Sequence, residues 1–134
     1  MFIRDFFILQ LKGKMKPFEL QLKPFVVPTT DGKLIEEHFG MASIFCGDFS
    51  FAHMIAPSGW SEPFQIPEFD EVTFVFSGKK KIEVEGETII LEKNQSICIK
   101  KGSSVRYSNP FEVSCEYVSV CIPAFTIDRV KRQE

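Results

Sequence analysis

The chain has 134 residues and a formal net charge of -2, a length that suits one domain with a single core. A charge this close to neutral excludes a broad basic surface for a phosphate backbone, so we predict no nucleic-acid partner. The lysine run at 79–81 is interpreted as the solvated start of a strand. Fifteen phenylalanines indicate a small β-structure filled with flat, rigid side chains.

The first fourteen residues are predicted to be an extension ahead of a single domain over 15–134. Met1–Leu11 is apolar, but Arg4 and Asp5 interrupt it and no small-residue cleavage site follows. It is too short and too charged for a membrane span, and a poor signal peptide. We therefore predict no membrane association. The extension is either dispensable or packed through its apolar face on the domain or on a partner subunit.

The cysteines indicate reduced thiols. None belongs to a Cys-x-x-Cys pair or has a histidine at zinc-finger spacing, which argues against a structural zinc site. Three of the four lie in apolar, strand-like runs, where a free cysteine behaves as a small hydrophobic residue. Without a secretory context, this pattern predicts a cytoplasmic protein. The four are Cys46, Cys98, Cys115 and Cys121.

The predicted elements begin at residues 18–22, where polar and apolar residues alternate. Nearby prolines place this segment at a sheet edge. Residues 34–39 fit either a short helix or an irregular arm. Residues 41–46 and 49–56 are predicted to pair as a hairpin across the turn at Gly47–Asp48.

The second half of the chain has β-type patterns throughout. Short strands separated by turns at this spacing predict an all-β, single-domain barrel or double-sheet jelly roll. The strands are expected at 71–76, 80–85, 88–91, 96–99 and 113–122, with a hairpin across Gly86.

The spacing of residues 59–109 resembles that of the cupin family. The first cupin motif reads Gly, five residues, His-x-His, three or four residues, Glu, six residues, Gly. Its positions are held here by Gly59, Gln65, Pro67, Glu71 and Gly78.

The second cupin motif reads Gly, five residues, Pro-x-Gly, two residues, His, three residues, Asn. The resemblance implies a cupin-like jelly-roll β-barrel and, since small cupins usually pair, a homodimer. A weaker likeness at 70–72, 86–88 and 101–104 is to the ethanolamine-utilisation EutQ-type branch. The positions of the second motif are held by Asn94, Lys100, Gly102, Val105 and Asn109.

The motifs depart from the family at the metal ligands. In typical cupins the two histidines and the glutamate of the first motif, with the histidine of the second, bind a transition metal. Gln65, Pro67 and Val105 occupy three of these four positions. Proline and valine cannot ligate through their side chains, and glutamine is a weak oxygen donor. We therefore expect no metal and no other cofactor.

Glu71 is the inherited polar residue and the first candidate for catalysis. Strand alternation, with Glu71 inward as in cupins, places Thr73 and Val75 inside the barrel as well. A carboxylate in a partly apolar pocket can act as a general acid or base. Equally, it can be a structural group bonded to backbone N–H groups or to a neighbouring Tyr or Arg.

His53 is the second catalytic candidate. If its strand face looks inward, it can approach Glu71 and Gln65 to form an acid/base pair or an atypical metal site. The alternative is a core or interface histidine with satisfied hydrogen bonds.

The remaining candidates would line a ligand pocket. Trp60 lies in the loop at the predicted barrel mouth, where Glu62, Glu68 and Asp70 add negative charge that favours a cationic ligand. The predicted ligand-binding residues are Trp60, Gln65, Thr73, Val105 and Tyr107.

Three functions fit these features. The first is a small-molecule-binding cupin without the usual metal. The second is an enzyme that uses Glu71 and His53, or an atypical metal held by His53, Gln65 and Glu71. The third is an accessory or scaffold protein with a vestigial pocket.

Overall fold

The computed structural model describes residues 16–133, so the predicted extension at 1–14 lies outside the described residues. No helix in the described range is long and apolar enough to cross a membrane. The elements are β1 (Phe25–Val26), β2 (Leu34–Gly40), β3 (Ile44–Phe45), β4 (Ser50–Ala56), β5 (Asp70–Ser77), β6 (Lys80–Val84), β7 (Glu87–Leu91), β8 (Ser96–Ile99), β9 (Val105–Ser108), β10 (Cys115–Ile122) and α2 (Ile127–Val130).

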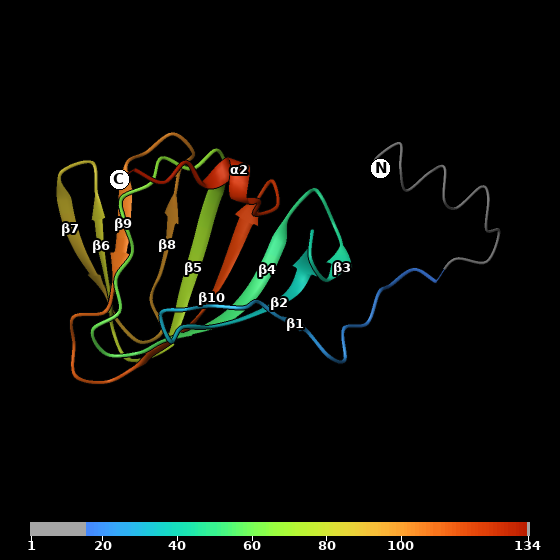
Figure 1. Cartoon of the computed structure of the whole chain (residues 1–134), viewed down its shortest axis with the longest axis horizontal. Helices are drawn as coiled ribbons and strands as arrows, with labels where there is room; N and C mark the ends of the chain where they lie inside the picture. The colour runs from blue at the N-terminus through green and yellow to red at the C-terminus, as the bar shows by residue number, and fades with distance from the viewer. Residues whose placement is uncertain (1–15, 134) are drawn as a thin grey trace.

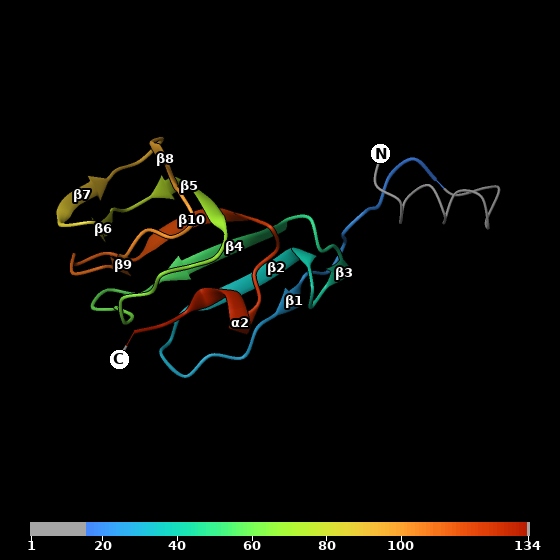
Figure 2. The same cartoon turned by 90° about the horizontal axis from the view of Figure 1, so that it is seen from above.

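The strands form two sheets, which confirms the predicted all-β jelly roll. The larger sheet has the order β1-β2-β4-β10-β5-β8, with β3 attached to β2, and the smaller has the order β7-β6-β9. In Figure 1 the smaller sheet and the first described residues lie at opposite ends of the molecule. Figure 2 shows β2, β4 and β10 extending away from the smaller sheet.

Alternation along the central strands decides which side chains face the interior. In β5, Glu71, Thr73 and Val75 are buried, whereas Val72 and Phe74 on the other face are only partly buried. This is the predicted inward set. In β10 the buried positions are the odd-numbered ones, and the register pairs Tyr117 with Met54 and Ser119 with Ala52 of β4.

The main core lies between the two sheets. Val75 and Tyr117 from the larger sheet pack with Ile82 and Val105 from the smaller one. Each of these side chains is at most 1% exposed, and full burial of one such apolar side chain stabilises the fold by about 1.5–3 kcal/mol. This core fixes the distance between the sheets at one end of the barrel.

Two residues retained from the cupin motifs have structural roles. Gly78 has a φ of +78°, and a Cβ atom there would overlap the Ser114 carbonyl, so the position favours glycine. The Asn109 amide is 1% exposed and donates to the carbonyl oxygens of Ala56, Pro57 and Val113. These contacts join the ends of β4, β5 and β10 rather than forming a reactive site.

The hairpin predicted across Gly86 is confirmed. β6 and β7 pair antiparallel from Lys80↔Leu91 to Val84↔Glu87. The two connecting residues, Glu85 and Gly86, have φ values of 45° and 81°, as a type I′ turn requires.

The N-terminal half departs from the predicted strands. Residues 18–22 form no strand, and Leu22 is 83% exposed, because their alternation has no sheet to pack on. Residues 34–40 are a strand rather than a helix or an arm, since they pair with β4. The predicted hairpin of 41–46 with 49–56 is wrong: only β3 forms in its first arm, and β3 pairs parallel with β2.

Candidate functional site

A cavity of about 370 Å³ opens on the inner face of the larger sheet. Strands β2, β4, β5, β6, β9 and β10 contribute to its wall, and the segments 27–33 and 125–132 border it. Its lining combines apolar side chains such as Met54 and Phe69 with charged groups of both signs. Small-molecule sites commonly have this size and mixture.

Glu71 lies in the cavity wall and accepts two side-chain hydrogen bonds. Tyr107 Oη donates to Glu71 Oε1 at 3.2 Å, and Ser119 Oγ donates to Glu71 Oε2. All three residues are buried. Burial, reinforced by the negative charge of Glu71, raises the pKa of Tyr107 well above its usual value. Tyr107 therefore stays a hydrogen-bond donor to this carboxylate.

Lys80 brings an amine to the same cavity. Its Nζ lies 3.6 Å from the ring centroid of Tyr117 and 4.3 Å from that of Tyr107, and the residue is 3% exposed. Burial lowers the pKa of Lys80 to about 8, although the Glu71 carboxylate opposes this change. Within residues 16–133 Lys80 forms no salt bridge.

A second lysine borders the cavity from the 27–33 segment. Lys33 Nζ lies 4.1 Å from the Trp60 ring centroid, and Trp60 Nε1 donates to Asp31 Oδ2 at 2.7 Å. Burial lowers the pKa of Lys33, opposed first by the charge of Glu62. The Asp31–Trp60 contact thus fastens this segment to the loop that follows β4.

The acidic residues of the predicted mouth each have a partner. Glu62 lines the cavity and lies 3.5 Å from Arg132; burial raises the pKa of its carboxyl, opposed by the charges of Lys33 and Arg132. Glu68 lies 3.7 Å from Lys131, and Asp70 accepts from the Lys101 N–H at 2.9 Å. The two ion pairs offset the charges of Glu68 and Glu62, which would have favoured a cationic ligand, whereas Asp70 is bonded to a neutral backbone group.

The predicted pocket residues separate into two groups. Gln65, Glu71 and Tyr107 line the cavity. Trp60, Thr73 and Val105 are buried at 0–5% exposure, but in the described part of the chain they are packed behind the cavity lining rather than within it. They support the wall, and Trp60 contacts two of the residues that line the cavity, Asp31 and Lys33.

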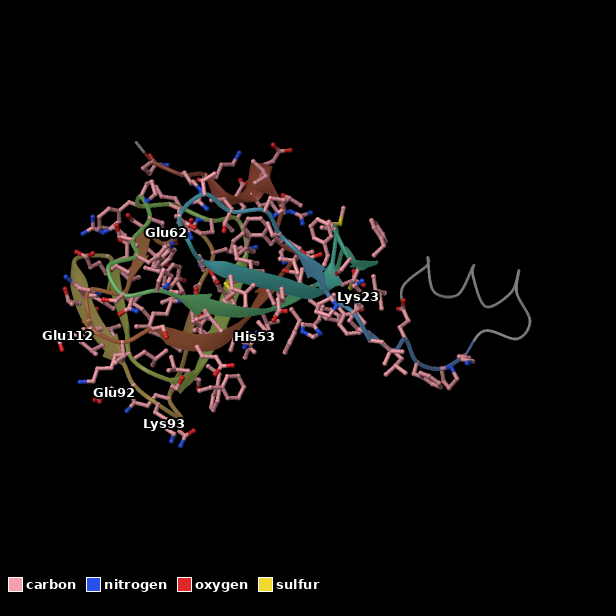
Figure 3. The ribbon with its side chains drawn as sticks, turned by 60° about the horizontal axis from the view of Figure 1, so that its bottom comes forward. Lys23, His53, Glu62, Glu92, Lys93 and Glu112 are labelled. Carbon is pink, nitrogen blue, oxygen red and sulfur yellow. The ribbon has the colours of Figure 1, made fainter. Side chains whose placement is uncertain are left out.

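His53 does not join this site. It faces outward from β4, where its Nδ1 lies 2.8 Å from Glu36 Oε1 and its Nε2 lies 2.6 Å from Glu116 Oε2. Figure 3 shows His53 and Glu62 on opposite sides of the larger sheet. The predicted inward approach of His53 to Glu71 and Gln65 is therefore wrong, because Ala52 and Met54 are the inward residues of β4.

Several residues of the site escaped the sequence reasoning. The lysine run at 79–81 is interpreted from the sequence as solvated, yet Lys80 lies two positions before the apolar Ile82. The two residues therefore share the inner face of β6. Tyr117 and Ser119 share the inward parity of β10 but had no motif to mark them. Lys33 and Arg132 lie outside regular strands, where no periodicity could place them.

The standard cupin metal does not fit these residues. The position of the second-motif histidine holds Val105, whose backbone pairs with Gln65 through two 2.9 Å hydrogen bonds. In the described range no three His, Cys, Asp or Glu side chains gather to hold a metal ion. Both carboxylate oxygens of Glu71 instead accept hydrogen bonds from hydroxyl groups.

A two-sheet jelly roll with a cavity on the inner face of its larger sheet is the architecture of a cupin. The family model described as "Cupin domain" (Cupin_2) matches residues 52–121, and the chain belongs to this family. A stretch of 100 residues, 75% of this chain, is 44% identical to a Myxococcus xanthus protein named Endoribonuclease YbeY. The match covers only about a third of that protein, 34% of its length.

Solved structures show the same fold at low sequence identity. Ethanolamine utilization protein Q of Salmonella typhimurium is 22% identical with a TM-score of 0.55, over 69% of this chain and 71% of that one. A Streptomyces PAC13 variant with uridine is 13% identical with a TM-score of 0.69, over 90% and 92% of the two chains. The polyketide cyclase RemF of Streptomyces resistomycificus is 13% identical with a TM-score of 0.64, over 81% and 80%. The likeness to protein Q agrees with the predicted EutQ-type resemblance.

Proposed function

We propose that this cupin binds a small polar organic molecule in its barrel cavity through its own side chains, without a bound metal. The observation that carries the proposal is the buried group of Glu71, Tyr107, Ser119 and Lys80 in the cavity wall. Burying an ammonium group is costly unless it is well paired. Because Lys80 lacks a salt bridge in the described chain, stability alone gives no reason to bury it.

The wall offers hydrogen bonds of both kinds to a ligand. Lys80 can donate, and the remaining lone pairs of Glu71 can accept. Tyr117 also lines the cavity, and its buried hydroxyl has no hydrogen-bond partner among the described residues. These groups suit a ligand with several oxygen functions, such as a hydroxylated carbonyl compound or a hydroxy acid.

The named relatives agree with small-molecule binding at the level of the fold. One similar structure contains uridine and another is a polyketide cyclase. At 13% identity these likenesses support use of the cavity, and the ligand of this chain follows from its own residues. Since the chain matches only a third of the YbeY relative, we assign it no ribonuclease activity.

A thermal-shift screen with amines, sugars, aldehydes and carboxylic acids tests the proposal. We expect at least one compound to raise the Tm of the wild type, and this rise to disappear in Glu71→Gln and weaken in Tyr107→Phe. Glu116→Gln is the matched control, because it changes a carboxylate on the outer face and leaves the cavity unchanged. If no compound stabilises the wild type more than Glu71→Gln, the vestigial-pocket alternative is favoured.

Metal analysis of purified, untagged protein tests the metal-free part of the proposal. We expect no stoichiometric transition metal. A stoichiometric metal that is lost in Glu71→Ala would overturn this part of the proposal.

The proposal includes a cytoplasmic location, which is supported by four free cysteines.

The proposal also includes a homodimer formed through the outer face of the larger sheet. Phe74 and Phe76 pack edge to face at 5.0 Å on this side, and Phe76 and Ile122 remain 45% and 47% exposed. Phe76 and Ile122 lie toward opposite ends of β5 and β10, and the partly buried Val72, Phe74, Val118 and Val120 lie between them. An apolar face of this kind is common at subunit contacts. Sedimentation should give a dimer for the wild type and a weakened dimer for Phe76→Asp; a monomeric wild type would contradict the proposal.

A further inference from the structure

We propose that Lys80 is a nucleophile that forms a reversible imine with an aldehyde or ketone group of a molecule held in the cavity. The inference rests on the proposed function and adds the ligand class, a small carbonyl compound. It also gives the buried amine a covalent role.

The position of Lys80 separates it from the neighbouring lysines. Lys80 begins β6 with its side chain on the inner face, where it lines the cavity. Lys79 is exposed and lies 3.9 Å from Glu92, whereas Lys81 is only partly buried. Of the three consecutive lysines, only Lys80 presents its amine to an enclosed space that can hold a ligand.

The surroundings of Lys80 favour an amine that can lose its proton. Burial is the largest influence, and it lowers the pKa of Lys80 to about 8. At pH 7 roughly a tenth of such amines are neutral, against fewer than about one in a thousand for an exposed lysine. The groups that act on Lys80 are Glu71 from β5, Tyr107 from β9, Cys115 and Tyr117 from β10, and Lys33 and Glu62 from the loops.

The reaction balances with the groups already present. The neutral Nζ of Lys80 attacks the carbonyl carbon, so that a C–N bond forms and the carbonyl π electrons move to oxygen. The nitrogen passes a proton to the Glu71 carboxylate, and the protonated Glu71 returns it to the former carbonyl oxygen, which gives a carbinolamine. A proton from solvent, equal to the one that the Lys80 ammonium released, then protonates the hydroxyl group. The C–O bond breaks, water leaves, and the nitrogen lone pair completes the C=N bond of a protonated imine.

The two tyrosine rings suit both the starting amine and its product. They lie 3.6 Å and 4.3 Å from Nζ and present their faces to it. A ring face attracts an ammonium or an iminium ion, so the protonated imine is stabilised where it forms. Tyr117 and Tyr107 also line this cavity, so the rings border the space in which the imine forms.

Reductive trapping with propanal and sodium cyanoborohydride at pH 7 tests the proposal, followed by peptide mapping. We expect the full chain to be alkylated at Lys80 at least tenfold faster than at Lys81. The rapid alkylation that we assign to Lys80 should be absent in Lys80→Arg and retained in Lys81→Arg. In Glu71→Gln its rate should fall about tenfold. Circular dichroism checks that each variant is folded. The site mapping on wild type stands even if a variant does not fold.

If Lys80 is labelled no faster than Lys81 in the folded wild type, the proposal that Lys80 forms an imine is wrong. If ligands still stabilise the wild type in a Glu71-dependent way, this result rejects the covalent step and leaves the proposed function intact. Absence of both labelling and ligand stabilisation rejects both proposals.

Discussion

Two clusters of charged residues lie on opposite faces of the larger sheet, and they differ in how completely their charges are paired. On the outer face His53 lies between Glu36 and Glu116, with each ring nitrogen 2.8 Å or less from a carboxylate oxygen. On the inner face Glu71 lies in the cavity, into which Lys80 extends from β6 of the smaller sheet, over aromatic rings and without a salt bridge in the described chain. In the outer cluster both ring nitrogens of His53 have carboxylate partners, whereas the inner cluster has donors and acceptors left for another molecule.

This difference suggests that the outer cluster serves stability and the inner cluster serves binding. A partly exposed histidine between carboxylates gains a modest stabilisation, because solvent screens the charges. A buried ammonium loses hydration and regains little of it from ring faces alone. Changes on the two faces should therefore have different effects on unfolding.

The largest effect is expected from removal of the inner carboxylate. Glu71→Leu leaves the Tyr107 and Ser119 hydroxyls without their acceptor and removes the main opposing charge from Lys80. We expect a loss of about 2 kcal/mol in the free energy of unfolding, measured with urea at pH 7. In the double variant Glu71→Leu/Lys80→Met part of this loss should be recovered. The single variant Lys80→Met completes the cycle, and a loss in the double variant equal to the sum of the two single losses would show that the two residues are not coupled.

A smaller effect of opposite sign is expected at Thr73. Its Oγ1 is buried without a hydrogen-bond partner in the described chain, and the residue is 0% exposed. Thr73→Val keeps the shape and removes the unpaired hydroxyl, so it should stabilise the fold by about 1 kcal/mol. Thr88→Val, on exposed β7, is the matched control and should change little. A destabilised Thr73→Val would show that this hydroxyl is hydrogen-bonded in solution.

The smallest effect concerns the outer cluster and pH. Burial would lower the pKa of His53, but hydrogen bonds to Glu116 and Glu36 outweigh it, so the pKa is raised above 6.5. The stabilisation is therefore fully present below pH 6.5, the unfolded value, and is lost as pH rises through the higher folded value. We expect a loss below about 1 kcal/mol in urea unfolding between pH 6 and pH 8.5. It should be absent in His53→Gln, and an equal loss in that variant would assign it to other groups.

The sequence predicted the second half of the fold closely because its strands carry clear alternation. β8 was placed at its observed bounds, and the inward parity of Glu71, Thr73 and Val75 followed from the period of two. β2 was missed because Leu34–Gly40 carries two acids and a histidine that resemble a loop. Its pairing with β4 gives Glu36 a partner in His53, and Glu37 accepts from the Ala42 N–H and the Ser43 hydroxyl.

The candidate site was only partly predictable. The cupin spacing placed Gln65 and Glu71 in the cavity wall, since they occupy motif positions that face the barrel interior in the family. It carried no information about Lys80, where the charged run at 79–81 concealed the parity shared with Ile82. The face of His53 depends on the β4–β10 register, which pairs His53 with Val118 and brings it to Glu116, 63 positions along the chain; such a long-range pairing cannot be inferred from local pattern.

The contact between Trp60 and Asp31 has a practical consequence for observing the cavity. Trp60 is the single tryptophan of the chain, so the intrinsic indole fluorescence comes from one site. Its N–H is hydrogen-bonded to Asp31, and Lys33 lies over its ring; both of these residues border the cavity. A molecule that enters and displaces either one alters the field on the fluorophore, which makes the emission of the unlabelled protein an optical report of occupancy.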